Sequence, residues 1–317
     1  MIITDSILAI EGISVGHADN LEARTGCTVI LCQEGFLTSC EVRGGAPGTR
    51  ENALLQPEAA MDRIHGLLLT GGSAFGLRAA AGVMEYLEER NIGFETGAAR
   101  VPIVPAAVIY DLAVGTSGVR PDREMAYKAC EDAEDNDEVR GKTGAACGAT
   151  VGKILGMNNC METGIGTAGY KKGELIVGAL AVCNAFGDIR DLESGEIIAG
   201  AKKPDGGFVD SRKLLIEGKN PGDMNPAKNT TLGVVATNAR LSKAMCKKVA
   251  SMAHNGLART IAPVHTMVDG DIIFCLASNR LEKVNVSRVG TIAAEVMARA
   301  IADCVKSINS GNNVGAK

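Results

Sequence analysis

Residues 220–239 read NPGDMNPAKNTTLGVVATNA and contain an abrupt change in composition between Asn229 and Thr230. The preceding segment, 202–229, is polar and holds three of the nine prolines and four glycines. It predicts a long loop, and loops of this length inside a compact domain are usually functional or disordered. Residues 230–239 are apolar and β-branched, which predicts a strand whose first residue is polar. The boundary at 229/230 is therefore the most informative place in the chain.

Outward from this boundary, short apolar runs alternate with helical stretches. The expected strands are 27–33 and 36–44, joined by a turn around Glu34 and Gly35, then 65–72, a hairpin over 174–201 that turns at 193–196, and 271–278. The expected helices are 73–91, 241–261 and 287–308. Helices separated by pairs of strands are typical of a layered α/β protein and not of a Greek-key sandwich.

The helical patterns also predict caps and buried faces. Ser73 is expected to cap the first helix, with Gly93 just past its end. The residues expected on the buried faces of the other two helices are Leu241, Met245, Val249 and Met252, and then Ile292, Val296, Ala300 and Ile301.

The composition excludes several classes of function. The 33 basic and 37 acidic residues give a net charge of −4, without the basic excess of a nucleic-acid-binding protein. With no Trp, four Tyr and six Phe, base-stacking platforms and aromatic cages are poor candidates. The four histidines are scattered and lack metal-ligand spacing, so we expect them to be structural or exposed and expect no metal or cofactor; they are His17, His65, His254 and His265.

The cysteines and the amino terminus bear on location. The ten cysteines include no C-x-x-C pair, and several lie inside apolar runs, so we expect reduced, buried thiols. The first residues carry Asp5 and Glu11 without a basic region, unlike a signal peptide. No apolar run reaches the ~18 residues of a membrane span. We expect one cytoplasmic domain over 1–317.

Three short motifs fail on inspection. GIGTAG (164–169) matches a dinucleotide fingerprint, but a strand pattern follows it where a helix is required. GATVGKI (148–154) is not a phosphate loop, because Ile154 stands where Ser or Thr must hold magnesium and Cys147 replaces the first glycine. In TGGSAFG (70–76), Ser73 has no well-placed histidine.

Thr230 suggests a different chemistry. A cut before this residue would make it an amino-terminal threonine whose own α-amino group, with an ordinary pKa near 8, suits a general base. The cut can be self-made if the hydroxyl attacks the preceding carbonyl and water resolves the resulting ester. Taken alone, the pattern favours the simpler interpretation, a loop followed by a strand with a polar first residue.

Several ordered blocks change this balance. GISVGHADNLEARTGCTVIL, EVRGGAPGTRE, LLLTGGSAFGL, VPIVPAAVIYDL, GATVGKILG, NAFGDI and NTTLGVVATNA resemble, in that order, the L-aminopeptidase/D-esterase family. This family also contains β-peptidyl aminopeptidases and 6-aminohexanoate-oligomer (nylon-oligomer) hydrolases. The similarity spans about residues 10–305. It implies an α+β fold with a four-layer αββα sandwich, self-cleavage into 1–229 and 230–317, and homo-oligomers, possible tetramers, of the cut units.

The resemblance also implies site residues. The nucleophile falls on Thr230, after Asn229 on the departing side of the cut. The remaining positions are Asn184 as the oxyanion-stabilising amide, Lys153 as a helper lysine, Asp269 and Asp271 as the acidic pair, and Tyr110 as a weaker match to a substrate-pocket aromatic. Thr at 230, Asn at 229 and Asp at 269 resemble the nylon-oligomer branch more than the aminopeptidase branch.

Residue patterns give these positions a physical basis and leave simpler alternatives open. Asn184 follows an apolar strand and could otherwise cap a turn. Asp269 and Asp271 stand two residues apart, which places both side chains on one face of a strand, although VDGD alone is a turn signal. Lys153 would otherwise be a solvated lysine.

The expected activity is hydrolysis of amide bonds in small peptides or ω-amino amides, without metal or cofactor. Two alternatives remain. One is an acyltransferase of the ornithine-acetyltransferase type, which also cuts itself before a threonine. The other is an uncleaved, non-enzymatic paralogue that keeps the fold.

Overall fold

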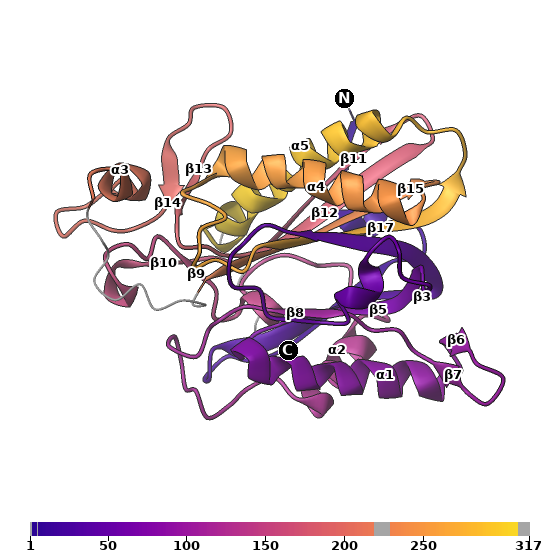
Figure 1. Cartoon of the computed structure of the whole chain (residues 1–317). Coiled ribbons are helices and arrows are strands. Elements are labelled where there is room, and N and C mark those ends of the chain that lie inside the picture. Colours follow the sequence, from indigo (N-terminus) through magenta and orange to yellow (C-terminus); the bar gives the residue numbers. More distant parts are fainter. Residues whose placement is uncertain (1, 5, 219–228, 310–317) are drawn as a thin grey trace.

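The computed structural model describes residues 2–4, 6–218 and 229–309. Its α-helices are α1 (Ala80–Glu89), α2 (Arg123–Asp132), α3 (Ser211–Ile216), α4 (Lys243–Thr260) and α5 (Val286–Asn309). Its strands are β1 (Ile2–Thr4), β2 (Ser14–Asn20), β3 (Thr25–Val42), β4 (Thr49–Arg50), β5 (Arg63–Thr70), β6 (Phe94–Glu95), β7 (Arg100–Val101), β8 (Ala106–Val108), β9 (Thr150–Val151), β10 (Met161–Glu162), β11 (Ile165–Lys172), β12 (Leu175–Asn184), β13 (Asp188–Arg190), β14 (Ile197–Ala199), β15 (Thr230–Ala239), β16 (Ile261–Ala262) and β17 (Ile272–Leu281). Helices α4 and α5 cover one side of the strands, and α1 and α2 cover the other (Figure 1).

One continuous sheet supplies both inner layers. Its strand order is β1-β11-β12-β15-β17-β3-β5-β8-β4, with β2 beside β3. The long strand β3 belongs to both layers, because residues 37–42 pair with β17 and residues 25–31 pair with β2. Its register on β5 shifts between Leu31 and Phe36, where Gly35 has φ +78°. The prediction of two strands joined by a turn at Glu34 and Gly35 is therefore wrong, since the same local signal marks an irregularity within one strand.

Three apolar cores separate the four layers. The α4/α5 layer packs on one face of β12, β15 and β17 through residues such as Val249, Val235 and Cys275. The opposite face of these strands packs against the second half of the sheet, where Val234 and Leu67 share a core. The third core lies between that half and the α1/α2 layer. Alternate residues of β15 therefore face different layers, as the period of two in a strand requires, and the architecture is an αββα sandwich.

Several local predictions hold, and others need correction. Strand β15 begins at Thr230 as predicted. Ser73 is not a helix cap: it has φ +53° and opens a 3₁₀ helix that precedes α1, which ends before Asn91. The predicted 174–201 hairpin is shorter than expected, because the turn joins only β13 and β14 while β12 pairs with β11 and β15.

The polar segment 202–229 is not wholly a loop. It contains α3, whose cap Asp210 accepts a hydrogen bond from the backbone N–H of Lys213; residues 219–228 lie outside the described part.

In α4, Leu241 precedes the helix and is buried with Val249, but Met245 is exposed and Met252 only half-buried, because the buried stripe runs through Cys246. In α5, Val296, Ala300 and Ile301 are buried and Ile292 half-buried.

The cysteines are unpaired, and all except Cys160 are buried, as expected. GIGTAG lies largely within β11, so no helix follows it. Among the residues that the structure describes, no helix is long and apolar enough to cross a bilayer.

Candidate active site

Three adjacent strands position the predicted nucleophile. Thr230 is the first residue of β15, and its antiparallel register partner on β12 is Asn184. Directly opposed residues of paired strands point their side chains to the same face, here the face toward the second sheet layer, shared with Leu232 and Val182. Both polar residues are buried, with Thr230 5% exposed and Asn184 fully covered.

The peptide bond between Asn229 and Thr230 lies against the turn before β17. The carbonyl oxygen of Asn229 accepts a hydrogen bond from the backbone N–H of Gly270 (2.8 Å) and a second one from the hydroxyl of Thr230. Gly270 allows this close approach: a Cβ at that position would lie 2.7 Å from Thr230 Oγ1 and 2.7 Å from the carbonyl oxygen of Ala46. The carbonyl next to the predicted nucleophile is therefore buried and doubly hydrogen-bonded.

The amide of Asn184 is oriented by its neighbours. Its Oδ1 accepts hydrogen bonds from Lys153 Nζ (2.7 Å) and from the backbone N–H of Thr150 (3.1 Å), while its Nδ2 donates to the carbonyl of Tyr110 (3.2 Å). Because an ammonium group only donates, Lys153 fixes which end of the amide is oxygen. The NH₂ end is therefore the end that donates, and in this structure it donates to the Tyr110 carbonyl.

Lys153 is itself buried, with its Nζ also bonded to the backbone carbonyl of Asn184 (3.0 Å). Burial lowers the pKa of Lys153 to about 8, because an ammonium group is poorly solvated there. The sequence places this lysine in a glycine-rich segment, and the structure brings it directly to Asn184.

Asp269 lies in the turn before β17 and is buried. Its Oδ1 accepts from the backbone N–H of Phe186 (3.1 Å), and its Oδ2 accepts from the backbone N–H and hydroxyl of Thr266. Burial, and then the charge of Asp271, raise the pKa of Asp269 to about 6. This carboxyl group therefore ties the turn to the segment that follows Asn184.

Asp271 approaches the start of β15 from the opposite face. Its Oδ1 accepts from the backbone N–H of Thr231 (2.7 Å), and its Oδ2 accepts from Nδ1 of His265 (2.7 Å). From the sequence, His265 was expected to be a structural or exposed histidine, and its contact with Asp271 was not predicted. The signal that could have found it is the short distance in sequence, since HTMVDGD carries His265, Asp269, Gly270 and Asp271 together.

The structure thus gathers most predicted positions around one peptide bond. Asn184 and Lys153 lie on the side of the second sheet layer, and the two aspartates hold the adjoining backbone. Of Tyr110, the contact observed here is that of its backbone carbonyl. Among the described residues, no group of three or more His, Cys, Asp or Glu side chains is arranged to hold a metal ion.

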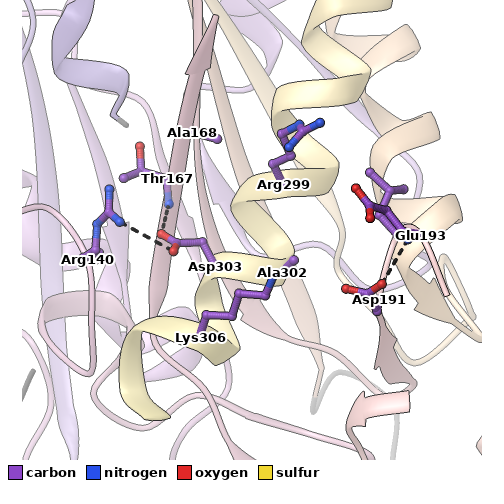
Figure 2. A pocket seen from close by; sticks show the side chains of 10 residues that line it. Arg140, Thr167, Ala168, Asp191, Glu193, Arg299, Ala302, Asp303 and Lys306 are labelled. Atoms are coloured by element: carbon purple, nitrogen blue, oxygen red, sulfur yellow. Dashed lines mark hydrogen bonds and ion pairs between the residues drawn. The ribbon is translucent and has the colours of Figure 1, made fainter. Parts of the chain in front are cut away.

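A surface pocket elsewhere offers a contrasting environment (Figure 2). It measures about 310 Å³ and is lined by Arg140, Thr167, Ala168, Asp191, Leu192, Glu193, Arg299, Ala302, Asp303 and Lys306. Asp303 accepts the backbone N–H of Thr167 (3.0 Å) and pairs with Arg140 (3.6 Å). Its lining mixes both signs of charge and includes none of the residues predicted for the active site.

Sequence comparisons find relatives that match most of the chain. The model of Peptidase family S58 matches residues 5–311. An uncharacterized aminopeptidase of Mycobacterium tuberculosis is 38% identical, over 94% of this chain and 92% of that protein. A 6-aminohexanoate-oligomer endohydrolase of Kocuria sp. is 32% identical, over 93% of this chain and 84% of that protein.

Solved structures share the fold. The L-aminopeptidase D-Ala-esterase/amidase of Ochrobactrum anthropi, described as a new variant among the Ntn hydrolase fold, has a TM-score of 0.70 at 16% identity and covers 96% of this chain and 86% of its own. A β-aminopeptidase of Burkholderia sp. has a TM-score of 0.66 at 19% identity, with 96% and 88% covered. The chain therefore belongs to peptidase family S58 and is a hydrolase of peptide or amide bonds.

Proposed function

We propose that the chain cuts itself between Asn229 and Thr230 and then acts as an amino-terminal-threonine hydrolase. One observation carries the proposal: the Asn229 carbonyl is buried, receives the N–H of Gly270 and lies within reach of the Thr230 hydroxyl. A carbonyl held by a fixed donor beside a hydroxyl is the arrangement that acyl transfer needs.

In the cut, Thr230 Oγ1 attacks the carbonyl carbon of Asn229. The carbon–nitrogen bond breaks, the nitrogen of Thr230 leaves as an amine that has gained the hydroxyl proton, and an ester joins residue 229 to Oγ1. Water then hydrolyses the ester, which leaves a carboxylate on Asn229 and restores the hydroxyl. The N–H of Gly270 stabilises the negative oxygen that forms in both steps.

In turnover, the freed α-amino group of Thr230 acts as the general base for its own hydroxyl. Oγ1 attacks the substrate carbonyl, the leaving amine takes the proton, and water releases the acyl group. Lys153 keeps the amide of Asn184 turned so that its NH₂ end donates to the oxyanion. Asp271 holds the backbone of Thr231 next to the new amino terminus, and Asp269 holds the backbone of Phe186 just after Asn184. Tyr110 lines the substrate site.

The substrate class follows from the relatives. We propose small peptides or ω-amino amides, because the similar proteins include aminopeptidases and 6-aminohexanoate-oligomer endohydrolases. The chemistry needs no metal or cofactor. We further propose that the cut units assemble into homo-oligomers, as the family resemblance implies.

Mass spectrometry of the purified protein tests the cut. We expect wild type to give fragments 1–229 and 230–317, Thr230→Ser to be cut, and Thr230→Ala to stay intact. A wild-type chain that remains intact contradicts the proposal. A fragment 1–229 lighter by one water would instead indicate that the Asn229 side chain cyclised, which also overturns the hydroxyl mechanism.

A further inference from the structure

His265 lies in the segment that leads into β17 and makes two bonds to one carboxylate oxygen. Its ring Nδ1 lies 2.7 Å from Asp271 Oδ2, and its backbone N–H donates to the same oxygen at 3.1 Å. A carboxylate only accepts, so the Nδ1 atom carries the proton. The residue has φ +57°, a conformation in which Asn, Asp and His are enriched among the residues other than glycine.

The other oxygen of Asp271 reaches the strand that carries the proposed nucleophile. Oδ1 accepts the backbone N–H of Thr231 at 2.7 Å, one residue after Thr230. The parallel ladder between β15 and β17 begins at Leu232 and Ile272. The carboxylate therefore extends the attachment of β15 to β17 toward its first residue.

The proposed cut makes this bond more important. In the uncut chain, the bond from Gly270 to the carbonyl of Asn229 also holds this end of the strand. After the cut, Asn229 belongs to the other fragment. The hydrogen bond between Asp271 and Thr231 then lies next to the new amino terminus, and it attaches β15 to the segment that leads into β17.

The ring of His265 is itself held in place. His254, from α4, packs against it edge to face with ring centroids 4.8 Å apart. His254 Nε2 lies 2.9 Å from the carbonyl oxygen of Glu41, and burial lowers the pKa of His254 to about 4. His254 is therefore neutral near pH 7, with its proton on Nε2 directed at that carbonyl.

We propose that His265 is a positioning residue for the reaction: its Nδ1–H fixes the rotamer of Asp271, which in turn fixes the backbone that carries the attacking hydroxyl and α-amino group. The inference rests on the proposed function. Misplacement of a catalytic group by about 1 Å can cost on the order of 10²-fold in rate. Loss of the hydrogen bond between His265 and Asp271 is therefore expected to change kcat more than KM.

Two variants isolate the side-chain donor. His265→Asn keeps an N–H near the position of Nδ1, and His265→Gly removes it, while both tolerate the positive φ. We expect His265→Gly to lower kcat by about 10- to 100-fold with a smaller change in KM. We expect His265→Asn to stay within about threefold of wild type, since a neutral donor suffices.

The measurement uses cut, full-length protein with two probes, an alanyl 4-nitroanilide and 6-aminohexanoyl 4-nitroanilide. The rate of self-cleavage is followed alongside, and we expect it to fall less than kcat, because the Gly270 bond still holds the uncut strand. The thermal unfolding midpoint of each variant is recorded. Equal kcat values for the Asn and Gly variants, or a loss that follows the folded fraction, would overturn the inference.

If His265→Gly does not fold, His265→Gln replaces it, because its longer side chain moves the donor away from the Nδ1 position; we expect the same loss of kcat, and wild-type kcat would overturn the inference. The two proposals fail separately. A wild-type chain that stays intact or hydrolyses neither probe contradicts the proposed function. A cut, active wild type with an equally active Gly variant contradicts only the role of His265.

Discussion

The two faces of β15 at its first two residues are built differently. Thr230 faces the second sheet layer, where its register partner Asn184 and the adjoining Lys153 supply an oriented amide and a buried cation. The next residue, Thr231, is held from the α4 side through its backbone by Asp271. One face carries groups suited to chemistry, and the other holds position. Changes on the first face should therefore affect rate directly, and changes on the second should affect rate through the position of the strand.

The largest effect is expected at Asn184. Asn184→Ala removes the proposed oxyanion donor and should lower kcat by about 10²–10³-fold. It also takes an acceptor from the buried Lys153 ammonium, which should cost about 1–3 kcal/mol of folding free energy. Steady-state kinetics and denaturant unfolding measure the two effects.

Asn238→Ala is the matched control, because Asn238 is a hydrogen-bonded amide near the far end of β15. It should lower stability and leave kcat of the folded protein unchanged. Adding Lys153→Met to Asn184→Ala should recover part of the stability but none of the rate. Recovery of kcat would show that Asn184 acts only by accepting the hydrogen bond of the buried Lys153.

The next effect concerns Gly270, in the turn that contacts the peptide bond between Asn229 and Thr230. Gly270→Ala places a methyl group 2.7 Å from Thr230 Oγ1 and should slow self-cleavage by about 10²-fold. A time course of fragment formation measures it. Gly118→Ala is the control, since its nearest neighbour would be 3.8 Å away. Cleavage of the Gly270 variant at the wild-type rate would show that this turn does not position the Thr230 hydroxyl for self-cleavage.

The smallest effect on activity is expected from Asp269, whose contribution is a pH dependence of stability. Its pKa in the folded protein is about 6, above the ordinary 3.8, so the folded state holds the proton more tightly. Its contribution to stability is therefore complete below pH 4 and lost as the pH rises through 6. Between pH 4 and 7, wild type should lose on the order of 2–3 kcal/mol relative to Asp269→Asn.

Denaturant unfolding across this pH range, with Thr230→Ala added to both chains, keeps each chain in one piece and checks the expectation. Parallel stability curves for the two proteins would mean that Asp269 keeps an ordinary pKa when folded.

The sequence predicted the start of β15 correctly because the change from polar to β-branched residues at Thr230 is abrupt. It failed at Glu34 and Gly35, because a glycine with positive φ serves equally in a turn and within a strand, and only long-range pairing distinguishes them. Ser73 and Met245 were misassigned for a related reason, since caps and buried faces depend on the neighbouring layers.

The site shows the same limit. The family blocks located Asn184 and Lys153, and the structure then brought them together. The nearness of His265 to two aspartates in HTMVDGD was a local signal, but which of the two it contacts is defined by the return of the chain into β17. Which face of a strand each group occupies follows from pairing, and a single sequence does not state it.

The order of strands in the sheet has a consequence for the proposed cut. Residues 230–317 supply β15 and β17, which lie side by side between β12 and β3 of the first fragment. The two products of the proposed cleavage would separate only by breaking a ladder on each side, so they would remain one folding unit in which neither piece has a complete core. Refolding after complete unfolding would become a second-order process that depends on protein concentration, and an enzyme cut in this way would be assembled once and not readily rebuilt.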